Sequence, residues 1–290
     1  MNNYKKEKRE EYDYCNICGK KEKLTWDHVP PKCCNNQYSI KTNSWMGGLP
    51  KDNKYDWKYQ NGIKFRSLCS KCNNELLGRN YDTVLAEFTN DIMQLVNSTL
   101  VIPPIFHQPV KINRLCRAIC GHLLAAKNFY DDKCIIDEEL RKYVLDMESL
   151  PPKGMSLMYW VYPYSTICLM RDVNVKSFSS AYYFPEGTIS IMNSVPVAYV
   201  LSTEKEEKCG LIDLFEYCNS DIDAEVYIPI KCDSCYFPGS NNLRSYLWPC
   251  NISDSDDGAA FLLGNSENMN DSKVAQHSIE SVKRIKMRQR

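Results

Sequence analysis

Two short stretches decide how the N-terminal third of the chain folds: Cys15-Asn-Ile-Cys18 and Cys69-Ser-Lys-Cys72. Two cysteines at this spacing turn both sulfurs onto one ion, and two such pairs complete a closed tetrahedral Zn²⁺ site. The sequence therefore predicts a structural zinc with the ligands Cys15, Cys18, Cys69 and Cys72. Residues 14 to 78 show little apolar periodicity, so we expect the metal to supply much of their folding free energy.

The charge of the chain is divided unevenly along its 290 residues. Lys and Arg (36) balance Asp and Glu (36) overall. Residues 1 to 79 nevertheless hold 16 basic against 9 acidic residues, a net charge of +7, which leaves −7 for the remainder. A polyanionic partner such as nucleic acid is therefore expected at the N-terminal third, around the cysteine pairs.

The chain has the composition of a folded globular protein, with 43% hydrophobic and 25% charged residues. No stretch approaches 18 uncharged apolar residues, and the N-terminus lacks the apolar core of a signal peptide. We expect a cytoplasmic protein without a membrane partner. Its cysteine count of 15 is odd, which favours reduced thiols and metal ligands over disulfides.

The cysteine pairs enclose an Asp27-His28 dipeptide that a proline soon follows, and Asn73 comes directly after the last cysteine. Over about residues 12 to 95 this order resembles the HNH endonuclease family. The resemblance implies a ββα-metal core, in which a hairpin and a helix hold one divalent cation, Mg²⁺ or Mn²⁺. It also implies that His28 is the general base and that Asp27 and Asn73 bind the catalytic metal.

The chemistry of phosphodiester hydrolysis asks for the same residue types. A neutral imidazole has an ordinary pKa near 6.5 and can take a proton from water near pH 7. Mg²⁺ prefers oxygen ligands and keeps several coordination positions for water and phosphate. His28, Asp27 and the amide oxygen of Asn73 meet these needs.

Positive side chains around this motif are candidates for binding phosphates, namely Lys32, Arg66 and Arg79, with Lys64 and Lys71 close in sequence. Trp26 is expected to pack under the zinc knuckle, with stacking on a base as the alternative. His122, in an apolar stretch, is expected to be a core histidine.

The fold class expected is α+β, with the HNH core followed by a mixed α+β domain. The expected parts are residues 1–13 (a polar arm), 14–98 (the nuclease domain), 105–250 (an α+β domain for target, partner or signal recognition) and 251–290 (a polar and basic tail). Apolar spacing predicts helices from 82, over 114–129 and from 137, with a short helix at 211–217. Strands are expected at 157–161, 166–170, 181–184, 188–191, 195–201 and 225–230.

The best interpretation is a metal-dependent endonuclease, with DNA favoured over RNA and a restriction or antiviral defence role by family analogy. One alternative is a non-catalytic zinc module that binds nucleic acid or protein. Another is an enzyme that stays silent until a protein partner or small molecule engages residues 105 to 250. A third cysteine pair, Cys232 and Cys235, lacks a well-spaced partner pair, and we interpret it as reduced thiols.

Overall fold

The computed structural model describes residues 9–43, 57–98, 105–162, 166–175, 187–194, 196–204, 211–231 and 260–266. Its helices and strands confirm the α+β class. A three-stranded antiparallel sheet forms the N-terminal part, in the order β1 (Tyr12–Tyr14), β2 (Lys21–His28) and β5 (Lys64–Cys69). The chain then enters a π-helix, η3 (Lys71–Arg79), and continues into α1 (Asp82–Val96).

A second, eight-stranded antiparallel sheet lies beneath these helices, with the strand order β11-β7-β10-β9-β8-β13-β3-β4. Its strands are β3 (Ile40–Asn43), β4 (Trp57–Tyr59), β7 (Ser156–Val161), β8 (Thr166–Val175), β9 (Gly187–Ser194), β10 (Val197–Ser202), β11 (Ile212–Asp213) and β13 (Ala260–Ser266). Strands β3 and β4 come from the segment between β2 and β5. The small sheet and the large sheet are thus built from interleaved parts of the chain.

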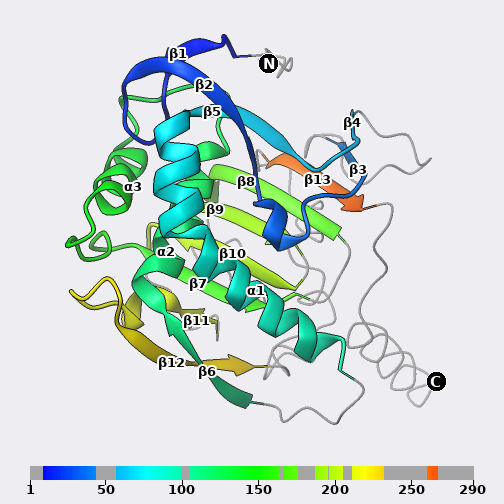
Figure 1. Cartoon of the computed structure of the whole chain (residues 1–290), viewed down its shortest axis with the longest axis vertical. Helices are drawn as coiled ribbons and strands as arrows, with labels where there is room; N and C mark the ends of the chain where they lie inside the picture. The colour runs from blue at the N-terminus through cyan, green and yellow to red at the C-terminus, as the bar shows by residue number, and fades with distance from the viewer. Residues whose placement is uncertain are drawn as a thin grey trace.

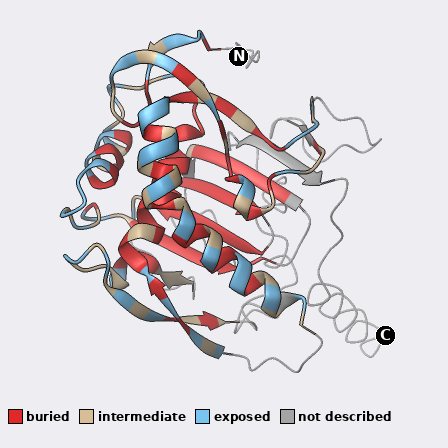
Figure 2. Cartoon of the chain, viewed as in Figure 1, coloured by how far each residue is buried: buried red, intermediate tan, exposed pale blue. Residues whose placement is uncertain are grey.

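Helices cover one face of the large sheet (Figure 1). The helix α1 packs on β7, where the rings of Phe88 and Tyr159 meet edge to face at 5.8 Å. Figure 2 shows the buried strands behind α1. The remaining elements are α2 (Ile112–Ala125), α3 (Ile135–Leu145), the 3₁₀ turns η1 (Lys32–Cys34) and η4 (Leu214–Tyr217), and the hairpin-like pair β6 (Ile105–Lys111) and β12 (Glu225–Lys231). None of the described helices has the length and apolarity needed to cross a membrane.

Three expectations about these elements need correction. The helix expected over 114–129 is α2, which begins at Ile112 and ends at Ala125. Of the short helix expected near 211–217, only Leu214–Tyr217 is helical, as the 3₁₀ helix η4, and it follows the two-residue strand β11. The expected C-terminal tail contains β13, which pairs with β8 and β3. The strand expected at 181–184 lies outside the described residues.

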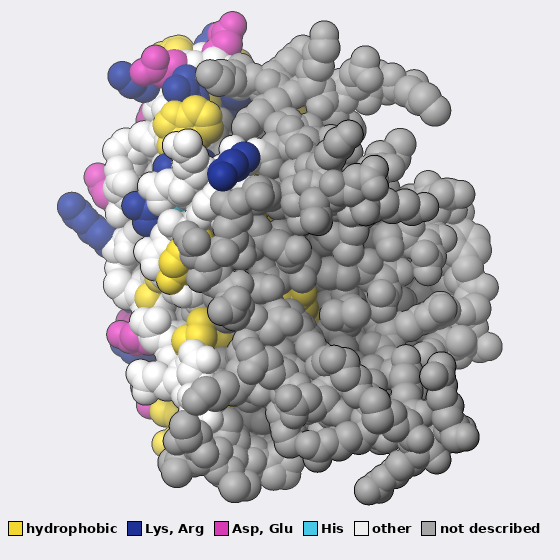
Figure 3. All heavy atoms as spheres, turned by 90° about the vertical axis from the view of Figure 1, so that its right-hand side faces the viewer, with side chains coloured by type: hydrophobic (Ala, Val, Ile, Leu, Met, Phe, Trp, Pro, Cys, Tyr) yellow, Lys and Arg dark blue, Asp and Glu magenta, His cyan; other side chains and the backbone are white. Residues whose placement is uncertain are grey.

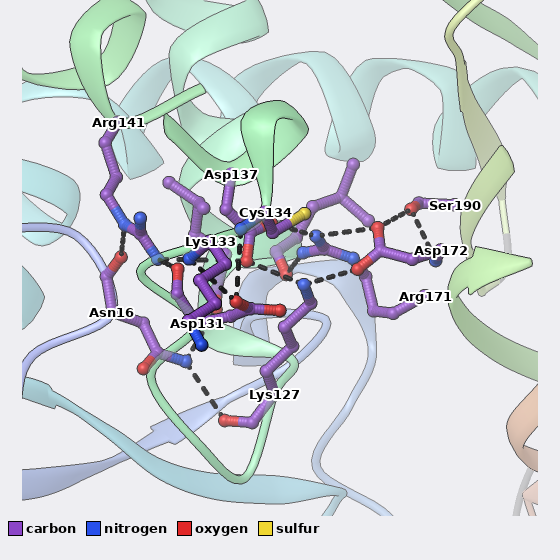
Figure 4. A network of polar contacts seen from close by, with 12 residues as sticks. Asn16, Lys127, Asp131, Lys133, Cys134, Asp137, Arg141, Arg171, Asp172 and Ser190 are labelled. Atoms are coloured by element: carbon purple, nitrogen blue, oxygen red, sulfur yellow. Dashed lines mark hydrogen bonds and ion pairs between the residues drawn. The ribbon is translucent and has the colours of Figure 1, made fainter. Parts of the chain in front are cut away.

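A buried polar network joins the first cysteine pair to the rest of the molecule (Figure 4). The side chain of Asn16 donates to the carbonyls of Leu124 (2.9 Å) and Lys127 (3.1 Å), at the end of α2. Arg141 of α3 donates to the carbonyl of Asn16 at 2.9 Å. The hydrophobic core also runs without a break from Cys15 to β12. The segments 14–98 and 105–231 therefore share one core.

Candidate functional site

Four cysteines converge where β1, β5 and η3 meet. The Sγ atoms of Cys15, Cys18, Cys69 and Cys72 all lie within 4.8 Å of one another. Those of Cys18 and Cys69 are 3.8 Å apart, and tetrahedral zinc with Zn–S bonds of about 2.3 Å requires about 3.8 Å. Cys15 and Cys72 share a hydrogen bond, which lowers the pKa of the Cys15 thiol and raises that of the Cys72 thiol. The donor set and its spacing fit a metal ion such as zinc.

His28 ends β2 with its imidazole held in one orientation. Its Nε2 lies 3.1 Å from the carbonyl oxygen of Asn61. Because a carbonyl only accepts, Nε2 carries the hydrogen and Nδ1 keeps a lone pair. Burial, and then the positive charge of Lys64, lower the pKa of His28 below its ordinary value. The imidazole is therefore neutral near pH 7 and able to take a proton.

The loop that carries Asn61 is pinned by Asn36. The Asn36 amide donates to the carbonyls of Pro30 (2.5 Å) and Ile63 (2.9 Å), and its Oδ1 accepts from the Ile63 N–H at 2.7 Å. Gly62 has φ +70°, and a Cβ there would lie 2.1 Å from the Asn36 carbonyl oxygen. Only glycine fits that turn. Asn61 is not among the site residues predicted from the sequence, although the Asn-Gly pair is a turn signal.

Asp27 points to the opposite side of β2 from His28 and is only 7% exposed. Its Oδ2 lies 3.1 Å from Nδ1 of His122, whose Nε2 lies 2.9 Å from Oδ1 of Asp82. Burial disfavours a charged His122, but the two carboxylates raise its pKa well above the ordinary value. His122 is thus a buried, satisfied histidine of α2, as expected. The unforeseen feature is that it holds Asp27.

Asn73 lies at the start of η3, beside β2. Its Nδ2 donates to Oγ1 of Thr25 at 2.9 Å and to the carbonyl of Trp26 at 3.3 Å. These bonds place the amide next to the residue that precedes Asp27. They use only the amide nitrogen, so Oδ1 remains the atom suited to a cation.

The described residues contain two groups of three or more His, Cys, Asp or Glu side chains arranged to hold a metal. One is the cysteine cluster. The other comprises Cys134, Asp137 and Asp172, whose carboxylates already pair with Lys127 and Arg171. Asp27 belongs to neither group, so a catalytic metal there would rest on few protein ligands.

The candidate phosphate-binding residues occupy different places. Lys32 is exposed on η1 and its charge acts on His28. Arg66 of β5 lies opposite Trp26, with its guanidinium 4.8 Å from the ring centre. Arg79 is exposed at the C-terminal end of η3. Trp26 is 48% exposed, so the expectation that it packs under the knuckle is wrong.

The pair Cys232 and Cys235 lies outside the described residues. Comparison with known proteins gives no family for the chain, because no family model, curated protein or solved structure matches it. A function for the chain is therefore inferred from the geometry of the site.

Proposed function

We propose that this chain is a metal-dependent endonuclease that hydrolyses phosphodiester bonds of DNA, with Zn²⁺ in the cysteine cluster as a structural ion. The observation that carries the proposal is the setting of His28. Its Nε2 is held by the Asn61 carbonyl, its Nδ1 is free to accept, and its imidazole is neutral beside Lys64 and Lys32. A binding module has no need of an oriented, neutral imidazole.

In this proposal Nδ1 of His28 takes the proton from a water molecule that attacks the phosphorus. The Asn61 carbonyl keeps the ring in place and stabilises the positive charge that it gains. Lys64 and Lys32 attract the phosphate to the same edge of the sheet. The site thus has a base and a phosphate-binding group on adjacent strands.

Asp27 and Asn73 would hold Mg²⁺ or Mn²⁺ through their free oxygens, with water and phosphate completing the coordination. When bound, such a cation stabilises negative charge on the phosphate oxygens. His122 fixes the carboxylate of Asp27 by its bond to Oδ2. Two protein ligands agree with the way proteins commonly bind Mg²⁺.

The test is cleavage of a supercoiled plasmid by the full-length chain with Mg²⁺ or Mn²⁺, with and without EDTA. We expect His28→Ala to lose at least about 10²-fold in rate, the usual weight of a general base. The matched control is His107→Ala, because His107 is exposed on β6, away from the zinc knuckle. Equal cleavage by wild type and His28→Ala would exclude this function.

A further inference from the structure

Two cysteine side chains outside the metal cluster meet where α2 contacts η4. The Sγ atoms of Cys116, on α2, and Cys218, directly after η4, are 3.6 Å apart, although the two residues are 102 positions apart in the chain. A disulfide bond is about 2.05 Å long, so the two sulfurs need to approach each other by about 1.5 Å to form one. The fold therefore brings two thiols to a distance at which a small side-chain movement can join them.

This thiol pair is separate from the proposed zinc ligands. The cysteine cluster lies at the end of the molecule that carries β1, where Lys and Arg side chains lie on the surface beside acidic and hydrophobic ones (Figure 3). Strands β11 and β12, which flank η4 in the chain, lie toward the opposite end (Figure 1). Within the part of the chain that the structure describes, neither Cys116 nor Cys218 belongs to a group of three metal-binding side chains. The pair is therefore suited to a covalent bond rather than to an ion.

Cys218 has the surroundings of a reactive thiol. Its side chain is partly exposed. The phenol oxygen of Tyr143 lies 3.7 Å from its Sγ, and the guanidinium of Arg117 lies over the Tyr143 ring at 4.2 Å. The hydrogen bond with Cys116, and then Tyr143 and Arg117, lower the pKa of Cys218. Because the thiolate is the form that oxidants attack, Cys218 is the member of the pair that reacts first.

Cys116 is suited to the second step. It is fully buried within α2, and burial, together with the hydrogen bond to Cys218, raises its pKa well above the ordinary value. It therefore remains a protonated thiol that dissolved oxidants do not reach. Its sulfur can react with a group that already lies beside it, and the Cys218 sulfur is such a group.

The turn that follows Cys218 already packs on α2 without a covalent bond. The Asn113 side chain donates to the carbonyl of Asp221 at 2.6 Å, and Arg114 pairs with Asp223 at 2.8 Å. These contacts hold Cys218 against α2 while its thiol is free. A disulfide formed there keeps the native arrangement, and a bond that closes so long a loop stabilises the folded state.

We propose that hydrogen peroxide oxidises Cys218 and that Cys116 then joins it in a reversible disulfide, which links η4 to α2. In the first step the Cys218 thiolate attacks one oxygen of the peroxide, the O–O bond breaks, and a sulfenic acid and hydroxide form. In the second step the Cys116 sulfur displaces the hydroxyl group of the sulfenic acid, which leaves with the thiol proton as water. The two sulfurs together lose two electrons, and the peroxide gains them. Neither residue belongs to the proposed nuclease site, so this oxidation goes beyond that function.

The experiment treats the reduced, full-length chain, supplied with Zn²⁺, with a small excess of hydrogen peroxide. The remaining thiols are blocked with N-ethylmaleimide, and peptides are mapped by mass spectrometry without reduction. We expect two peptides linked through Cys116 and Cys218, which dithiothreitol separates. The midpoint of thermal unfolding should rise by about 5 °C on oxidation, because the bond closes a long loop. Both effects should be absent from Cys218→Ser and present in Cys120→Ala, a control one helical turn along α2.

The order of the two steps is tested with dimedone, which labels sulfenic acids. In Cys116→Ser the partner thiol is missing, so Cys218 should accumulate as the sulfenic acid and become labelled. In Cys218→Ser the buried Cys116 should stay unlabelled. The absence of a link between Cys116 and Cys218 in the oxidised wild-type chain, labelling of Cys116 in Cys218→Ser, or a wild-type midpoint that does not rise would each overturn the proposal.

Discussion

Asp27 and His28 are neighbours in sequence, but their side chains leave opposite faces of β2. The His28 side chain points toward Lys64 and the Asn61 carbonyl, whereas the Asp27 side chain points into the protein toward His122. A short motif gives the types and spacing of residues, and it says nothing about a partner 95 positions away. The sequence could therefore predict Asp27 and His28 as candidates, and could not predict that α2 supplies the group that holds Asp27.

At this scale we expect His122→Gln to weaken the proposed reaction. Glutamine lacks the positive charge of the His122 imidazolium, which contacts the carboxylates of both Asp27 and Asp82. The carboxylate of Asp27 therefore loses its fixed orientation. Changes to groups that orient metal ligands typically cost 10- to 100-fold in metal affinity or activity. Cleavage should therefore fall about that much, and half-maximal activity should require more Mn²⁺. The measurement is plasmid cleavage against Mn²⁺ concentration, alongside thermal unfolding.

The matched control for that variant is His107→Gln on β6, which should behave as wild type. A merely structural role for His122 would lower the unfolding temperature and leave the Mn²⁺ dependence of the remaining activity unchanged. That result would contradict the role given to His122 here.

Among the elements, the three α-helices were predictable, whereas the π-helix η3 and several strands were not. The apolar spacing that predicts α1 is a local property of the sequence. It places Val84, Leu85, Phe88 and Ile92 on one face of the helix, and that face is buried in the protein core. Strand β6 contains Pro109, a residue that argues against a strand. Strand β13 lies in a polar segment and is defined by its pairing with β8 and β3, which no local pattern encodes.

The cysteine cluster brings three elements together at one point, and we expect loss of a metal bound there to unfold them. Cys69→Ser should lower the zinc content from one equivalent per chain, because the remaining three sulfurs no longer close the tetrahedron. The metal supplies folding free energy in such sites, so the thermal transition should move to lower temperature. Elemental analysis and thermal unfolding measure both effects. Cys33→Ser, outside the cluster, is the control, and a Cys69→Ser chain with full zinc and wild-type stability would exclude the site.

At the scale of the whole molecule, the polar network and the shared core couple the stability of residues 14–98 to that of residues 105–231. The basic residues of the N-terminal third include Lys21, Lys64 and Arg66, which lie on the small sheet. The charge pattern gives no sign that β3 and β4 enter the large sheet or that Arg141 holds Asn16. Such contacts join residues that are far apart in the chain. The sequence shows which residues are present, but it does not show which of them will contact each other.

The centre of the network is a set of buried ion pairs that should make stability depend on pH. Arg171 contacts Asp137 at 2.7 Å and Asp172 at 3.2 Å, and Lys127 contacts both carboxylates. Burial alone would raise the pKa of Asp172, but Arg171 and Lys127 outweigh it and lower the pKa below 3.8. The stabilisation is therefore complete above about pH 4 and is lost as the pH falls through that lowered value.

Asp172→Asn should consequently destabilise the full chain by about 3 kcal/mol at pH 7, because it leaves buried cations short of a partner. The difference from wild type should shrink below about pH 4, where wild-type Asp172 becomes protonated in turn. Urea unfolding at several pH values measures this. Asp223→Asn is the matched control: Arg114 lowers the pKa of Asp223 to about 2, but that pair is open to solvent, where ion pairs contribute little. If both variants lose the same stability at pH 7, the buried network does not hold the two halves together.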